Sequence, residues 1–210
     1  MSRAEPNILI LGIGNVLWAD EGFGVRVVER IARQYRFADP VRLLDGGTQG
    51  IYLVDQVRWA DVLVVFDAID YGLPPGTLKL IAGDAVPTFM GAKKMSLHQT
   101  GFQEVLALAE LLGEPPRHQL LIGVQPVDLD DFGGSLRPEV KAMIDPAIAA
   151  ARTYLDRFAV AWLPADGTDT TRLDMPHEAL DIAVYEAGRP SPEAACRIGD
   201  WRVLASRANG

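Results

Sequence analysis

Cysteine is the scarcest informative residue in this 210-residue chain, which contains one, Cys196. A single cysteine cannot form an internal disulfide. Cys196 also lies in a polar C-terminal stretch, remote from any metal-ligand spacing. We therefore assign it no role.

Long apolar runs and an excess of positive charge are also lacking. The longest strongly apolar runs, 8–13 and 62–66, are far shorter than the roughly 20 residues that cross a bilayer. Residues 1–6 lead straight into a strand pattern without the apolar core and cleavage site of a signal peptide. The net charge is -8, which argues against nucleic acid or an anionic membrane as a partner. We expect a cytoplasmic protein.

What the chain does contain is enough apolar residues, 49%, to bury one sizeable core. Short β-rich runs alternate with longer helical patterns, which predicts an α/β three-layer sandwich with a twisted, mainly parallel five-stranded sheet flanked by helices. This domain should span residues 1–164. Beyond it periodicity weakens, so we expect residues 165–210 to be an extension of limited structure. We expect a monomer.

The positions of individual helices and strands are predicted from the spacing of apolar residues and from turn-forming residues. The first helix should start at Gly22 with Asp20 as its N-cap, and a later one near Ser96, where the spacing is that of a capping box. The strand at 77–81 is amphipathic and follows a proline-rich turn, which suits a sheet edge. The other strands are expected at 8–11, 41–44, 62–66 and 119–124, and the other helices at 51–57 and 138–158.

Four side chains that can bind a metal ion or transfer a proton lie where a predicted strand ends or a helix starts: Glu21, Asp45, Asp67 and His98. If the sheet is parallel, its strand ends meet at one edge, where open α/β sheets place their ligands. Carboxylates and an imidazole together suit a divalent ion such as nickel or zinc. The pattern alone does not identify the metal.

Each of these residues also has an ordinary explanation. Glu21 would complement the dipole of a helix in its first turn. Asp45 and Asp67 could serve as turn residues. His98 could simply be a residue at a helix start without a role in a site. Their joint placement is what favours a shared site.

The glycines at Gly12 and Gly14, after a buried strand, raise the possibility of a dinucleotide site. The match is poor because the fingerprint's third glycine position holds Leu17. Asp20 and Glu21 at the helix start would also repel a pyrophosphate. The sequence therefore disfavours a nucleotide-dependent enzyme.

Several ordered motifs together resemble those of the hydrogenase maturation proteases, over roughly residues 7–160. They are Gly12-Ile13-Gly14-Asn15, Asp20-Glu21-Gly22-Phe23-Gly24-Val25, Asp45-Gly46-Gly47-Thr48, Phe66-Asp67-Ala68, His98-Gln99 and Gly123-Val124-Gln125-Pro126. The resemblance implies an endopeptidase that removes a C-terminal extension from the large-subunit precursor of a nickel-iron hydrogenase after nickel insertion. It also implies that Glu21, Asp67 and His98 bind metal, and that Asp45 is an additional acidic residue near the cleft.

By the same resemblance, the nickel belongs to the substrate precursor and acts as the recognition signal. Two mechanisms remain open. In the first, the metal polarises the scissile carbonyl or activates water, and Asp45 or Asp67 is the general base. In the second, carboxylates, Glu21 included, activate water as in aspartic proteases, and the metal serves only for docking. The sequence has neither the usual aspartic-protease loops nor a His-Glu-x-x-His helix. A non-catalytic nickel-binding chaperone is the competing hypothesis.

Overall fold

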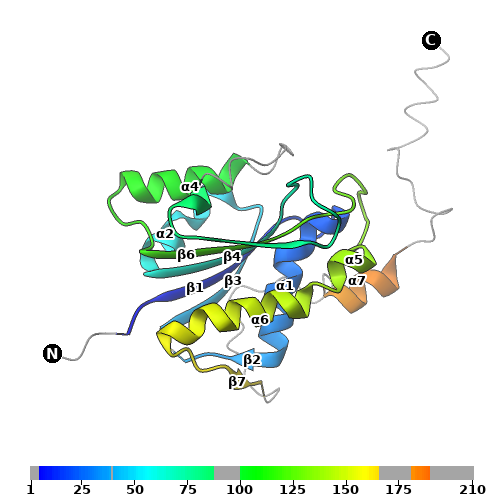
Figure 1. Cartoon of the computed structure of the whole chain (residues 1–210). Coiled ribbons are helices and arrows are strands. Elements are labelled where there is room, and N and C mark those ends of the chain that lie inside the picture. The colour runs from blue at the N-terminus through cyan, green and yellow to red at the C-terminus, as the bar shows by residue number, and fades with distance from the viewer. Residues whose placement is uncertain (1–4, 39, 88–99, 166–180, 190–210) are drawn as a thin grey trace, which may run out of the picture.

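A computed structural model describes residues 5–38, 40–87, 100–165 and 181–189 of the chain. Its centre is a five-stranded sheet in the order β3-β1-β4-β6-β5 (Figure 1). All neighbouring pairs are parallel except β5 with β6, which is antiparallel. The strands are β1 (Ile8–Ile13), β3 (Val41–Gly47), β4 (Val62–Ala68), β5 (Leu78–Ala82) and β6 (His118–Val124). The predicted α/β class and the edge position of β5 are confirmed.

Helices cover both faces of this sheet (Figure 1). Those on one face are α1 (Phe23–Gln34), α5 (Pro138–Lys141) and α6 (Ile144–Leu155). Those on the other are the 3-10 helix η2 (Gly50–Leu53), α2 (Val54–Trp59) and α4 (Thr100–Leu111). Among the helices of the described ranges, none has the length and apolar character needed to span a bilayer.

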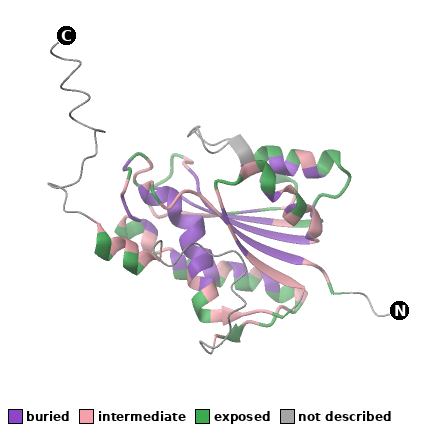
Figure 2. Cartoon of the chain, turned by 180° about the vertical axis from the view of Figure 1, so that it is seen from behind, coloured by how far each residue is buried: buried purple, intermediate pink, exposed green. Residues whose placement is uncertain are grey.

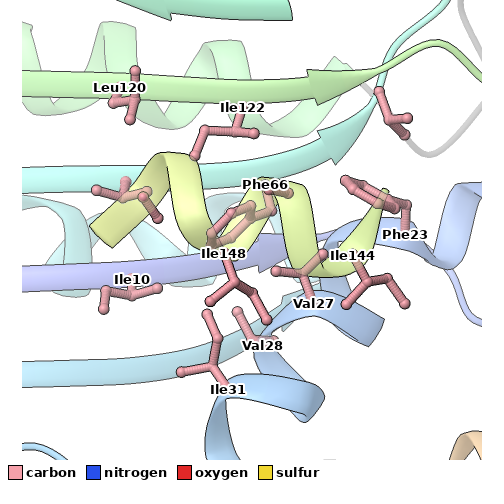
Figure 3. Close-up of a cluster of buried hydrophobic side chains, with 14 of the residues drawn as sticks. Ile10, Phe23, Val27, Val28, Ile31, Phe66, Leu120, Ile122, Ile144 and Ile148 are labelled. Atoms are coloured by element: carbon pink, nitrogen blue, oxygen red, sulfur yellow. The ribbon is translucent and has the colours of Figure 1, made fainter. Parts of the chain in front are cut away.

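Two apolar clusters, one on each face of the sheet, explain why the layers hold together. Phe66 of β4 belongs to the cluster under α1 and α6, and Val65 to the cluster under α2 and α4. Strand β4 is buried along its whole length, as expected for a central parallel strand. Figure 3 shows Phe23, Phe66 and Ile148 meeting between the sheet and the helices. Each such side chain stabilises the fold by about 1.5–3 kcal/mol.

The start of the first helix differs from the prediction. The 3-10 helix η1 (Ala19–Gly22) precedes α1, whose N-cap is Gly22. Asp20 is therefore not the N-cap, and no side chain caps α1. Its carboxylate instead bonds backbone groups more than 100 residues away in sequence, because a fully buried carboxylate needs several N–H donors at once.

The long helix predicted at 138–158 is interrupted. It consists of α5, α6 and the 3-10 helix η3 (Asp156–Phe158), with a break at Ala142 and Met143. Pro146 explains this break, because its ring conflicts with the carbonyl four residues earlier and it has no N–H to donate. The prediction that Pro138 opens the first turn is confirmed.

Part of the C-terminal stretch expected to have limited structure is helical. The strand β7 (Leu163–Pro164) pairs with β2 (Tyr35–Arg36), and α7 (Ile182–Gly188) contacts the domain. The backbone N–H of Ile182 donates to Glu29 at 3.0 Å, and Lys141 forms an ion pair with Glu186 at 2.8 Å. The division of the chain at residue 164 stays a prediction.

Candidate functional site

Asp45 and Asp67 lie at the same edge of the sheet, as predicted, but inside strands rather than after them. Gly12 of β1 pairs with Asp45 on one side and with Phe66 on the other. Because neighbouring strands are about 4.8 Å apart, Asp45 and Phe66 are separated by about 10 Å across β1. Asp67 follows Phe66 and pairs with Gly123. Strand pairing therefore fixes the backbone of both candidate carboxylates.

The two aspartates face opposite sides of the sheet. Asp45 is in register with Gly12, whose missing Cβ would point at Gly24 of α1. Asp67 is in register with Gly123, whose missing Cβ would meet the ring of Tyr71. Since paired residues of neighbouring strands share a face, Asp45 belongs to the α1 face and Asp67 to the face covered by α2 and α4. The sequence predicted that both aspartates lie at one edge of the sheet, but not that they lie on opposite faces.

Glu21 is buried in η1, between the end of β1 and the start of α1. Two glycines make this placement possible. Gly14 has a φ of +137°, and a Cβ there would lie 1.8 Å from the carbonyl oxygen of Glu21. A Cβ on Gly24 would lie 2.1 Å from the carbonyl oxygen of Phe66. The glycine-rich motif thus serves close backbone packing, which brings Glu21 to the strand ends.

The metal site predicted from Glu21, Asp67 and His98 is described only in part. Both carboxylates are almost completely buried, with 4% and 2% of their surfaces exposed. His98 and the predicted helix start at Ser96 lie outside the described residues; α4 is described from Thr100. Within the described ranges, no three acidic, histidine or cysteine side chains are grouped to hold a metal ion. The assignment of these residues as metal ligands stays a prediction.

The acid–base chemistry of Asp45 is altered by its surroundings. Burial raises the pKa of Asp45 to about 6, although the backbone N–H of Gly47 donates to its Oδ1 at 2.8 Å and Arg26 attracts its charge. The negative charge of Glu29 adds to the increase. A carboxyl group with this pKa is ionised at neutral pH and can still accept a proton readily. This pKa suits acid–base chemistry near neutral pH.

Arg26 and Glu29 form a buried pair on α1, on the same face of the sheet as Asp45. Their side chains meet at 2.8 Å, and Arg33 bonds the other oxygen of Glu29 at 2.5 Å. Burial raises the pKa of Glu29, but the hydrogen bonds from Arg26, Arg33 and Ile182 outweigh it and leave the pKa below its usual range. Glu29 thus stays ionised, and α7 is attached to the pair through Ile182.

Asp67 affects the tyrosine beside it. Burial, and then the charge of Asp67, raise the pKa of Tyr71 well above its usual range. Tyr71 therefore keeps its proton at neutral pH. Its ring also packs against the second apolar cluster and against Gly123. This tyrosine forms one wall beside the Asp67 carboxylate.

Asp20 was missed as an organiser of the site. One of its carboxylate oxygens accepts hydrogen bonds from the backbone N–H groups of Val127 and Asp128, at 2.9 and 3.0 Å. The other accepts from the N–H of Arg137 at 2.7 Å. Asp20 therefore holds the 127–137 loop, which follows β6, against the segment that carries Glu21. Its position in the Asp20-Glu21-Gly22 motif was the only sequence signal.

Gln125 plays a similar part for the loop after β4. Its side-chain oxygen accepts from the backbone N–H groups of Tyr71 and Leu73, and its amide donates to Asp70 at 3.0 Å. These bonds fix the backbone directly after Asp67. Gln125 belongs to the Gly123-Val124-Gln125-Pro126 motif, but its partners lie more than 50 residues away in sequence.

A mainly parallel α/β sheet carries the buried Glu21 and Asp67 and the half-buried Asp45, whose pKa is raised to about 6, at its carboxyl edge, which makes this edge a candidate active site. A family model described as hydrogenase maturation protease matches residues 25–153. The chain belongs to the hydrogenase maturation protease family, and it is an endopeptidase of hydrogenase maturation. The resemblance inferred from the sequence motifs is thereby confirmed.

Individual relatives agree with this assignment. The hydrogenase expression/formation protein HupD of Thiocapsa roseopersicina is 65% identical over 204 residues, which cover 97% of this chain and 92% of that protein. The hydrogenase 2 maturation protease of Escherichia coli is 38% identical over 160 residues, covering 76% and 96%. The structure of the E. coli endopeptidase HybD matches with a TM-score of 0.72 and 37% identity, covering 77% of this chain and 99% of that one. This chain is thus longer than the E. coli proteases but matches HupD over nearly its whole length.

Proposed function

We propose that this endopeptidase removes the C-terminal extension of a nickel-iron hydrogenase large-subunit precursor after nickel insertion, in the cytoplasm. The observation that supports this best is the group of carboxylates at the carboxyl edge of the sheet: Glu21 and Asp67, which are buried, and Asp45, which is half-buried. Burying a carboxylate costs free energy that only hydrogen bonds, ion pairs or a bound metal can offset. In a chain of this family, that cost is consistent with a processing site.

We assign different roles to the two faces of the site. Glu21 and Asp67, with His98, would bind nickel that the precursor brings, because carboxylate and imidazole groups suit a divalent ion. Asp45 lies on the other face and would not share that ion with Asp67. Nickel is then part of the substrate, and a precursor without it would lack the recognition signal.

Asp45 is our candidate for the general base. As a water oxygen attacks the scissile carbonyl, the Asp45 carboxylate would take a proton from the water, and it would return this proton to the leaving amine. The base must be ionised before attack and protonated afterwards, which a pKa of about 6 permits near neutral pH. This is the second of the two mechanisms that the sequence left open, in which a carboxylate is the base and nickel serves for docking.

Three conservative variants test the assignment: Glu21→Gln, Asp67→Asn and His98→Gln. Each keeps the size of the side chain and removes a charge or a metal-ligand nitrogen. We expect the variants to stay folded, measured by circular dichroism, while the precursor keeps its C-terminal extension in mass spectrometry. Glu104→Gln, on the exposed surface of α4, is the control and should process normally. Normal processing by all three site variants would rule out the proposed metal-binding role.

A further inference from the structure

Exposed apolar side chains are concentrated at the carboxyl edge of the sheet. Of the eleven large apolar side chains exposed in the described residues, six lie on segments that follow strands at this edge, four of them on loops and two in η2. Single exposed apolar residues are ordinary, but a group at one end of a domain marks a binding surface. The six are Leu17 after β1, Ile51 and Tyr52 after β3, Leu73 after β4, and Val127 and Phe132 after β6.

Two of these loops hold one another and form what we call the apolar loop surface: Leu17, Trp18, Val127 and Phe132. Trp18 and Phe132 form an antiparallel bridge, and their rings meet edge to face with centroids 5.2 Å apart. The N–H of Gly133 donates to the carbonyl of Leu17 at 2.7 Å. Phe132 and Val127 nevertheless leave 54% and 45% of their surfaces exposed. The loops are thus joined to each other without covering their apolar side chains.

This surface is rigidly attached to the candidate site. The buried Asp20 carboxylate bonds the N–H groups of Val127 and Asp128, and the N–H of Asp20 donates to the carbonyl of Asp128 at 3.2 Å. Arg137 bonds the side chains of Asp128 and Asp131 at 2.8 and 2.9 Å. Glu21 directly follows Asp20 in the chain. A surface ordered before binding loses less entropy when a partner docks.

We propose that the apolar loop surface binds an apolar side chain of the polypeptide that is cleaved, close to the scissile bond. This proposal rests on the proposed function, because it takes the large-subunit precursor as the bound chain. An endopeptidase must hold its substrate beside the catalytic groups, and this surface is continuous with the segment that carries Glu21. The net charge of -8 disfavours the other simple occupant, a second copy of this chain.

The test compares serine variants of the full-length protein in cleavage of nickel-loaded precursor. Phe132→Ser and, separately, Val127→Ser remove apolar surface while keeping the backbone bonds of the loop. Leu111→Ser is the matched control, since Leu111 is 82% exposed at the end of α4, before the start of β6, whereas Val127 and Phe132 follow the end of β6. We expect KM to rise about tenfold for Phe132→Ser with kcat within about twofold of wild type, and the control to leave both unchanged. Phe132→Leu, which restores apolar contact, should recover most of the affinity.

Several results would overturn the proposal. Unchanged KM in both loop variants shows that the surface does not contact the substrate. If the loop variants lower kcat and the melting temperature while KM stays unchanged, the loops have only a structural role. Sedimentation that detects a wild-type dimer, abolished by Phe132→Ser, shows that a second copy occupies the surface. If wild-type protein does not cleave the loaded precursor at all, the proposed function itself fails, and this inference fails with it.

Discussion

Replacing Asp45 with asparagine should stabilise the protein while it impairs processing. In the unfolded chain the pKa of an aspartate is about 3.9, whereas burial raises the pKa of folded Asp45 to about 6. Between these two values the folded state binds more protons than the unfolded state, so stability falls as pH rises. Above pH 6 the ionised side chain costs stability in full. Asparagine removes this cost and can still accept the hydrogen bond from the Gly47 N–H.

The size of the effect follows from the difference of about two units in pKa. One unit corresponds to about 1.36 kcal/mol, so Asp45→Asn should raise the free energy of unfolding by about 3 kcal/mol at pH 8. The gain should shrink to about 1.5 kcal/mol at pH 5 and to about 0.5 kcal/mol at pH 4. Solvent screening of this half-buried side chain would reduce each value while keeping the order.

Urea unfolding of the wild type and the variant at these three pH values measures the effect. Asp84→Asn, at an exposed position after β5, is the control for the loss of one negative charge and should show no such pH dependence. A variant that is equally stable or less stable at pH 8 would refute the burial argument. A variant that gains stability but still processes the precursor at the wild-type rate would refute the role of Asp45 as base.

Four further predictions follow from the structure. The ratio kcat/KM should fall about tenfold per pH unit below about 6, where Asp45 becomes protonated; a flat profile between pH 5 and 7 contradicts this. Asp20→Asn should lower the free energy of unfolding by about 3 kcal/mol in urea titration, because both carboxylate oxygens accept backbone bonds and the amide nitrogen that replaces one of them cannot accept any. Gly24→Ala should cost at least about 3 kcal/mol in the same assay, because its Cβ would overlap backbone oxygens. A double-mutant cycle on Lys141 and Glu186 should give about 0.5–1 kcal/mol, since the pair is partly exposed; zero coupling would mean that the ion pair does not hold α7.

The sheet could be predicted from sequence because its strands are continuous apolar runs separated by clear turn residues. The burial pattern in Figure 2 shows why: the central strands and much of α1 are buried, while exposed residues concentrate on the outer helices and loops. Strand ends were placed too early at Asp45 and Asp67, because a polar residue after an apolar run looks like the start of a loop. Both residues remain paired with neighbouring strands. Pairing, not polarity, decides where these strands end.

Parts of the site depend on contacts that no local pattern contains. An aspartate just before a helix suggests an N-cap, but Asp20 bonds groups 107 and more residues away. The role of Gln125 likewise depends on the loop after β4. Which face each carboxylate occupies depends on the register of β1 with β3 and β4. Motifs therefore point to the residues of the candidate site, while tertiary contacts determine the bonds that Asp20 and Gln125 make.

The most direct test of the central claim is mass spectrometry of the precursor after incubation with purified protein, with and without nickel loaded in the precursor. The account predicts loss of the C-terminal extension from the loaded precursor alone. It also predicts no further mass change when the mature large subunit is incubated in the same way. Tight binding of the loaded precursor without any loss of mass would contradict the account and would support a non-catalytic chaperone.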